Sequence, residues 1–263
     1  MNLAIASAPW YLLAVAIIGV AVCLALLGIV QVRRYVGVEK LRNNHDVASS
    51  TFGIIGLIYG VILGFTIVNV HDRFNHAHQN VENEAKALID LYRDAAVFPP
   101  EVRDNIRNHL REYVEHVIHD EWPKMMNETR IKVIPPKSVT ALWHAYYQYT
   151  PQDIRQKAWY ETSIGNLNEF SDLRHGRIFN TRYSQGAMMW TLLIGGAIIT
   201  VFFMCFFGSS SLLSQMLMTA CLAACIAFML FLIFTLDAVF TGGARLEPTA
   251  FNDVLQSFDN WKD

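Results

Sequence analysis

The stretch SSTFGIIGLIYGVILGFTIVNV, residues 49–70, carries no charged side chain. A run of about 20 apolar residues is long enough to cross the hydrocarbon core of a bilayer as a helix. Three further blocks of this kind lie at residues 9–32, 187–207 and 212–234, and a tight turn over residues 208–211 would join the last two. The sequence therefore predicts an all-α integral membrane protein with four membrane-spanning helices.

The first apolar block, WYLLAVAIIGVAVCLALLGIV at residues 10–30, is predicted to be a retained span. A cleaved signal peptide would carry basic residues before its apolar run and a small-residue cleavage site after it. Here Arg33 and Arg34 follow the run instead. Trp10 and Tyr11 suit one membrane interface, where aromatic side chains are enriched.

Charged residues concentrate between the second and third spans, and this segment is predicted to be a separate helical domain. Apolar residues recur there at helical spacing. We expect helices over residues 71–98, 101–122, 138–149 and 151–182, with Pro123 ending the second and Pro151 in the first turn of the last. The expected organisation is a membrane hairpin (1–70), the helical domain (71–185), a second membrane hairpin (186–236) and a tail (237–263).

Several classes of protein are not expected from this sequence. The net charge of −2, with no lysine- and arginine-rich arm, argues against nucleic-acid binding. No nucleophile elbow, phosphate loop or dinucleotide fingerprint is present, so neither an enzyme nor a cofactor is expected. The cysteines all lie in apolar blocks, where they pack as small apolar residues: Cys23, Cys205, Cys221 and Cys225. The clustered histidines lack a strong metal-ligand spacing, and no metal site is expected: His71, His76, His78, His109, His116 and His119.

The second span has two contrasting faces at 100° per residue. Four glycines fall on one narrow face, which is predicted to pack closely against another helix: Gly53, Gly56, Gly60 and Gly64. The opposite face is apolar at one end and polar at the other. It is predicted to line a pore, where an apolar constriction gates and polar groups replace the water around an ion. That stripe comprises Ile55, Ile58, Tyr59, Ile62, Thr66, Asn69 and Arg73.

Charges near the span ends bear on selectivity and topology. A pore-facing Arg73 would add a positive ring at the inner mouth, whereas an Arg73 paired with Asp72 or lipid phosphate would leave selectivity unchanged. Asp237 ends the fourth span and is either a functional charge or the first residue in the interface. Lysines and arginines near the span ends, including Lys40 and Arg42, nearly balance across the membrane and favour a cytoplasmic central domain by a small margin.

Three stretches resemble the bestrophin-like family of bacterial and plant membrane proteins. The first is GLIYGVILGFTIVNVHDRF (residues 56–74) followed by VENEAKALIDLYRDA (81–95). The second is LREYVEHVIHDEW (110–122), and the third is LDAVFTGGARLEPTAF (236–251). Their order and spacing are more specific than any single stretch, and the match spans most of residues 50–255.

The resemblance implies four spans, a cytoplasmic helical domain and an oligomeric anion channel of the bacterial inner membrane. The subunits would form a ring, a pentamer, with the second span lining a pore that passes small ions such as chloride. The stripe departs from bestrophin necks in offering Ile55, Ile58, Tyr59 and Ile62 where those necks carry aromatic residues. An acidic calcium clasp is also not evident in the sequence.

Two other functions fit the same arrangement of spans. A stator-type subunit of a proton-driven motor also places a cytoplasmic helical domain between spans two and three, but it needs a partner with a membrane carboxylate. A non-conducting sensor or scaffold would form a sealed helix bundle without a central passage.

Overall fold

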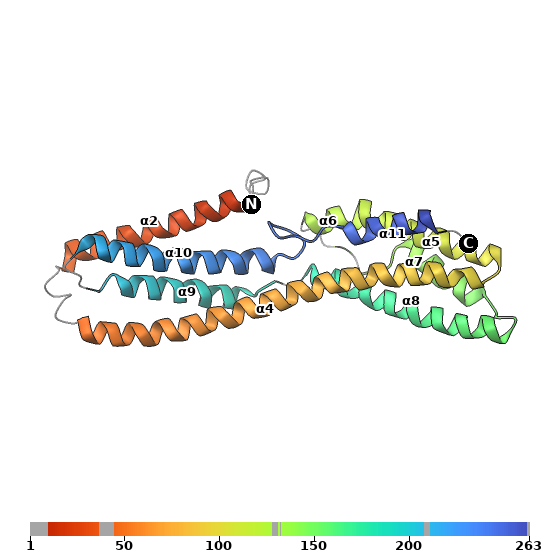
Figure 1. Cartoon of the computed structure of the whole chain (residues 1–263), viewed down its shortest axis with the longest axis horizontal. Helices are drawn as coiled ribbons and strands as arrows, with labels where there is room; N and C mark the ends of the chain where they lie inside the picture. Colours follow the sequence, from red (N-terminus) through yellow and green to blue (C-terminus); the bar gives the residue numbers. More distant parts are fainter. Residues whose placement is uncertain are drawn as a thin grey trace. The chain divides into compact units, whose positions relative to one another are not determined.

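The computed structural model describes residues 10–36, 45–127, 131, 133–182, 184–207 and 211–261, whose regular structure is helical throughout (Figure 1). The helices that could cross a membrane are α2 (Trp10–Val36), α4 (His45–Asp94), α9 (Ala187–Met204) and α10 (Leu212–Asp237). The predicted all-helical fold with four spans is confirmed. Most of the predicted turn (208–210), Lys40 and Arg42 lie outside the described residues.

Helix α4 is a single element of 50 residues that includes the second span and the amphipathic segment after it. No glycine or proline occurs between Gly64 and Asp94, so nothing in this stretch interrupts the helical hydrogen bonds. The helix ends in a short 3₁₀ turn, η1 (Ala95–Val97), just before Pro99 and Pro100. At 1.5 Å per residue, α4 is about 75 Å long.

Residues Met1–Arg73 and Ser184–Ala238 form one compact unit, which contains α2, the membrane part of α4, α9 and α10. Helix α10 packs along α2 and also contacts α9. The buried cluster shared by α4, α9 and α10 comprises Tyr59, Leu63, Val70, Leu193, Ala197, Ile226 and Ile233. Many other large apolar side chains of this unit are exposed, including Leu57 and Phe65 on α4. Exposed apolar surface of this extent fits contact with lipid or with other protein.

Residues Phe74–Tyr183 and Val239–Asp263 form the second compact unit. It contains the rest of α4, then α5 (Pro100–His116), η2 (Val117–Glu121), α6 (Trp122–Met126), α7 (Lys137–Gln148), α8 (Ile154–Asn180) and α11 (Thr249–Asn260). Helix α11 buries Phe251, Val254 and Phe258, and the Phe258 ring stacks on Tyr92 with centroids 4.1 Å apart. The tail after the fourth span therefore completes the core of this unit.

Two predicted helix boundaries are wrong. Pro123 does not end a helix, because the chain passes from α5 through the π-helical turn η2 into α6, where Pro123 lies in the first turn. Pro123 is tolerated there because it lies at the start of α6, directly after the i→i−5 bond of η2 has interrupted the α-helical hydrogen-bond pattern. Pro151 does not lie in the first turn of α8, which begins at Ile154 because the Asp153 carboxylate caps it, accepting from the Gln156 N–H at 2.7 Å.

Candidate functional site

One face of the membrane part of α4 is buried against α9. The Tyr59 hydroxyl donates to the Leu193 carbonyl at 2.8 Å, and a Cβ added at Gly196 would lie 2.5 Å from the Tyr59 ring. The Thr66 hydroxyl is buried on the same side and donates to the Ile62 carbonyl at 2.8 Å. Glycine at position 196 thus allows the close approach of α9 to the tyrosine ring. Tyr59 and Thr66, which both belong to the predicted pore stripe, are therefore buried and hydrogen-bonded within the chain.

The remaining circumference of this part of α4 is open in the single chain. Ile58 is 57% exposed and Asn69 is also exposed, while Ile55 and Ile62 are half-buried, and Ile62 packs against the cluster shared with α9 and α10. On the glycine face, a Cβ added at Gly53, Gly56, Gly60 or Gly64 would meet nothing within 4 Å. Within the described residues this face makes no close contact with another helix, and its packing role stays a prediction.

Arg73 forms an ion pair with Asp237 rather than with the neighbouring Asp72. Its Nη1 lies 3.2 Å from Oδ1 of Asp237, at the end of α10. Asp237 also accepts a hydrogen bond from the Ser184 hydroxyl at 2.8 Å. Its two carboxylate oxygens each lie 3.0 Å from the Gln185 backbone N–H. Asp237 therefore joins the ends of α4 and α10 to the segment before α9, and it is a buried pairing residue.

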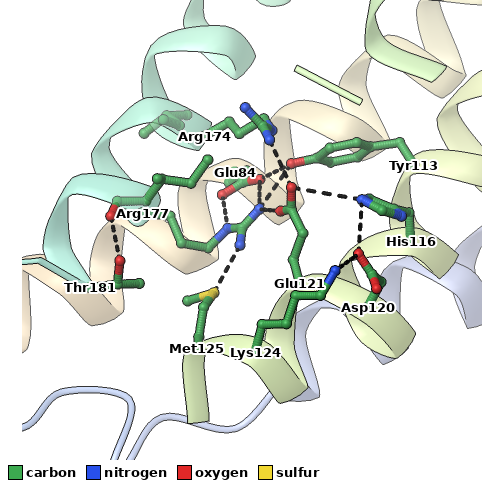
Figure 2. A network of polar contacts seen from close by, with 12 residues as sticks. Glu84, Tyr113, His116, Asp120, Glu121, Lys124, Met125, Arg174, Arg177 and Thr181 are labelled. Atoms are coloured by element: carbon green, nitrogen blue, oxygen red, sulfur yellow. Dashed lines mark hydrogen bonds and ion pairs between the residues drawn. The ribbon is translucent and has the colours of Figure 1, made fainter. Parts of the chain in front are cut away.

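A buried network of charged groups lies within the second unit (Figure 2). At its centre is the fully buried Arg177 of α8, whose Nε donates to Glu84 of α4 at 2.8 Å and whose Nη2 donates to Glu121 of η2 at 2.7 Å. Arg174, one turn earlier, donates to the other oxygen of Glu121 at 2.7 Å. The Tyr113 hydroxyl of α5 donates to Glu84 and accepts from Arg177. The two carboxylates and two guanidinium groups balance in charge and join α4, α5, η2 and α8.

Burial and pairing together determine the protonation states in this network. Burial alone would raise the pKa of Glu121, but the guanidinium groups of Arg177 and Arg174 outweigh it and lower that pKa below its usual range. Burial would lower the pKa of Arg177, but Glu84 and the neighbouring acidic groups raise it well above its usual value. Burial and the Glu84 charge raise the pKa of Tyr113, which therefore stays a neutral donor. The network is held as ion pairs.

The π-helical turn η2 directs Glu121 into this network. The Trp122 N–H bonds to the Val117 carbonyl, five residues earlier, instead of the four of an α-helix. This turn accommodates one extra residue between Tyr113 and Glu121, and both side chains reach Arg177. Trp122, immediately after the turn, buries its ring near Phe240 and Phe251 of the tail segment.

Three histidines form ion pairs, and one of them, His116, also reaches the buried network, because its Nε2 lies 3.9 Å from Oε1 of Glu121 (Figure 2). His78 pairs with Glu82 at 3.1 Å, His109 with Glu112 at 3.1 Å, and His116 with Asp120 at 3.6 Å, all on helix surfaces. Within the described residues, no group of three or more histidine, cysteine or acidic side chains is arranged to hold a metal ion.

Comparison with known proteins assigns the chain to a family. Residues 19–251 match the bestrophin-like domain family. The chain belongs to the bestrophin-like family. The resemblance inferred from the sequence motifs is therefore confirmed, although no curated protein matches the sequence.

Solved structures show the bestrophin fold for this chain. A variant of a bacterial bestrophin homolog from Klebsiella pneumoniae matches with a TM-score of 0.71 and 11% identity, covering 92% of this chain and 97% of that one. A second structure of that homolog matches with a TM-score of 0.69 and 12% identity, covering 92% and 98%. At such identities the likeness shows the fold alone.

Sequence reasoning missed the central pairing of this bestrophin-like chain. Glu84, Tyr113 and Glu121 lie within the motif stretches 81–95 and 110–122, but the sequence assigned none of them a role, and it did not single out Arg174 or Arg177. Arg177 and Glu84 are separated by 93 residues, so no local spacing brings them together. One signal was available: Arg174 and Arg177 are three residues apart on one helical face, and buried guanidinium groups need buried carboxylates.

Proposed function

We propose that the protein is an oligomeric ion channel, selective for anions, in which α4 lies nearest the symmetry axis. The observation that supports this proposal is the distribution of contacts on α4. One face is buried against α9, while the glycine face and the face around Ile58 have no cover from the described part of the chain. A helix with a small-residue face and a second open face suits a ring in which it packs on a neighbour and borders a passage.

The residues proposed to border the passage are the members of the predicted stripe that are not fully buried within the chain. Ile55, Ile58 and Ile62 would form an apolar constriction, with Asn69 and Arg73 toward the polar end. Tyr59 and Thr66 would fix the orientation of this stripe from behind, because both are buried within the chain. The glycine face would pack on the adjacent subunit: Gly53, Gly56, Gly60 and Gly64.

The family assignment supports the rest of the proposal. We expect a ring of identical subunits, a pentamer by family resemblance, in a bacterial inner membrane with the second unit in the cytoplasm. Within that unit, the buried network would hold α4 against α8 through the Glu84–Arg177 pair. Loss of the Glu84–Arg177 pair would weaken the packing of α4 against α8 in the second unit.

Purified protein in a planar bilayer tests this function. Under a KCl gradient, an anion channel gives a reversal potential near the chloride equilibrium potential, and the mass of the detergent-solubilised particle gives the number of subunits. Currents that reverse near the potassium equilibrium potential would contradict anion selectivity. A monomer that carries no current would favour a sensor or scaffold, and a current that appears only with a carboxylate-bearing partner would favour a stator.

A further inference from the structure

Asp237 forms an ion pair with Arg73 and so compensates its charge. The two side chains are 27% and 7% exposed, and their charged atoms lie 3.2 Å apart. An arginine with a carboxylate at this distance contributes much less positive potential to its surroundings than an arginine alone. The charge that ions would meet here is therefore that of the pair.

Hydrogen bonds from the segment just before α9 also hold the Asp237 carboxylate in place. The Ser184 hydroxyl donates to its Oδ2 at 2.8 Å, and the Gln185 N–H lies 3.0 Å from each oxygen. These donors directly precede α9, whose 18 residues place the positive end of the helix dipole next to the carboxylate. Because its donors come from two segments, the carboxylate is held in place and cannot move away from Arg73 without losing hydrogen bonds.

We propose that Asp237 is a specificity-determining residue: it sets the electrostatic potential at the polar end of the α4 stripe by neutralising Arg73. Its consequence for ions rests on the proposed channel function, but the potential itself can be measured in any folded protein. If the pair is neutral, the preference for anions is weaker than a ring of unpaired arginines would give. Removing the carboxylate while keeping its shape should then strengthen that preference.

Asn69 offers a sensor for this potential. It is exposed and lies one turn before Arg73 on α4, a rise of about 6 Å. That distance is within the physiological screening length of roughly 8 Å. An Asn69→Cys protein in which Cys23, Cys205, Cys221 and Cys225 are replaced can react with methanethiosulfonates that carry either a sulfonate or a trimethylammonium group. The ratio of the anionic to the cationic reaction rate reports the local potential.

We expect Asp237→Asn to raise this rate ratio roughly threefold and Arg73→Gln to lower it by a similar factor. Two variants separate charge from packing. Ser184→Ala removes a hydrogen bond to Asp237 but no charge, and Asp237→Glu retains the charge, so both should leave the ratio within error of the parent. If Asp237→Asn fails to fold, the double variant Arg73→Gln/Asp237→Asn, which leaves neither charge of the pair unpaired, decides the matter: its ratio should exceed that of Arg73→Gln alone, and equal ratios would overturn the proposal.

An unchanged ratio in a folded Asp237→Asn protein would overturn the proposal and reduce Asp237 to a packing role. In bilayers, the same substitution should raise the chloride-to-potassium permeability ratio about threefold. A rate ratio that shifts in a protein without current would refute the channel function while supporting the role of Asp237 in setting the potential.

Discussion

Arg177 is the residue on which the second unit depends most. Its guanidinium is fully buried and contacts both Glu84 and Glu121, whose side chains are 0% and 4% exposed. Replacing Arg177 with Met leaves two carboxylates buried without their main partner, and we expect a loss of about 3–5 kcal/mol in the free energy of unfolding. Thermal or denaturant unfolding in detergent measures it.

The exposed pair of Arg111 and Asp259 provides the control. Their charged atoms lie 2.7 Å apart, and the side chains of Arg111 and Asp259 are 35% and 64% exposed. Arg111→Met should therefore cost about 1 kcal/mol or less. Equal losses in the two variants would show that the buried network contributes no more than a surface pair.

Glu121 and Asp94 give the protein opposite responses to acid. The folded state lowers the pKa of Glu121, so its contribution to stability is present above the unfolded pKa and is lost as the pH falls through the folded pKa. Burial raises the pKa of Asp94 despite its pairing with Arg93, so protonation of Asp94 favours the folded state as the pH falls. The contributions of Glu121 and Asp94 can be separated by measuring, in variants of each, how steeply the free energy of unfolding changes with pH.

We expect the free energy of unfolding to decline below about pH 4.3, the usual pKa of glutamate. This decline should be shallower in Glu121→Gln and steeper in Asp94→Asn. Unfolding measured at a series of pH values provides the slopes. Identical slopes in all three proteins would mean that neither carboxyl has a shifted pKa in the folded state.

At the scale of elements, the crossing of α4 and α9 depends on one of two adjacent glycines. A Cβ at Gly196 would overlap the Tyr59 ring, whereas a Cβ at Gly195 would meet nothing within 4 Å. Gly196→Ala should therefore destabilise the protein by about 1–3 kcal/mol, since the tyrosine must move and strain its bond to Leu193. Gly195→Ala is the matched control and should be neutral or slightly stabilising. The melting temperature in detergent distinguishes them, and a tolerated Gly196→Ala would argue against this helix crossing.

The π-helical turn is the second element whose length matters. Deleting His119, which is exposed, would restore α-helical spacing and rotate Tyr113 and Glu121 by about 100° relative to each other. One of them would then leave Arg177, and we expect a loss of stability close to that of Arg177→Met. His119→Ala keeps the turn and should behave like the parent protein. A deletion variant as stable as His119→Ala would show that the π turn does not position Glu121.

Features that depend on local sequence were predictable at the level of whole elements. The four spans follow from uninterrupted apolar runs, and the helical domain follows from periodicity and prolines. The boundary at Pro123 was predicted wrongly because the π turn depends on Glu121 meeting Arg174 and Arg177 from α8. No local pattern contains that contact.

The candidate site could be predicted only in part for the same reason. Helical angles group Tyr59 and Thr66 with Ile58, but they do not say which side α9 covers. Pairing of Arg73 with Asp237, 164 residues away, likewise depends on how the spans assemble. The sequence suggested Asp72 as a protein partner of Arg73 because the two residues are adjacent.

For the whole molecule, the central claim is that the open face of α4 borders a passage for ions. Ile58→Cys, in a protein without its four native cysteines, places a thiol on that face, and Met218→Cys places one on the exposed surface of α10. Bilayer currents recorded while a charged methanethiosulfonate is added test the claim most directly. We predict that the reagent blocks most of the current through Ile58→Cys and leaves the current through Met218→Cys unchanged. A conducting Ile58→Cys protein whose current does not change, although mass spectrometry shows the thiol to be modified, would contradict a pore lined by α4.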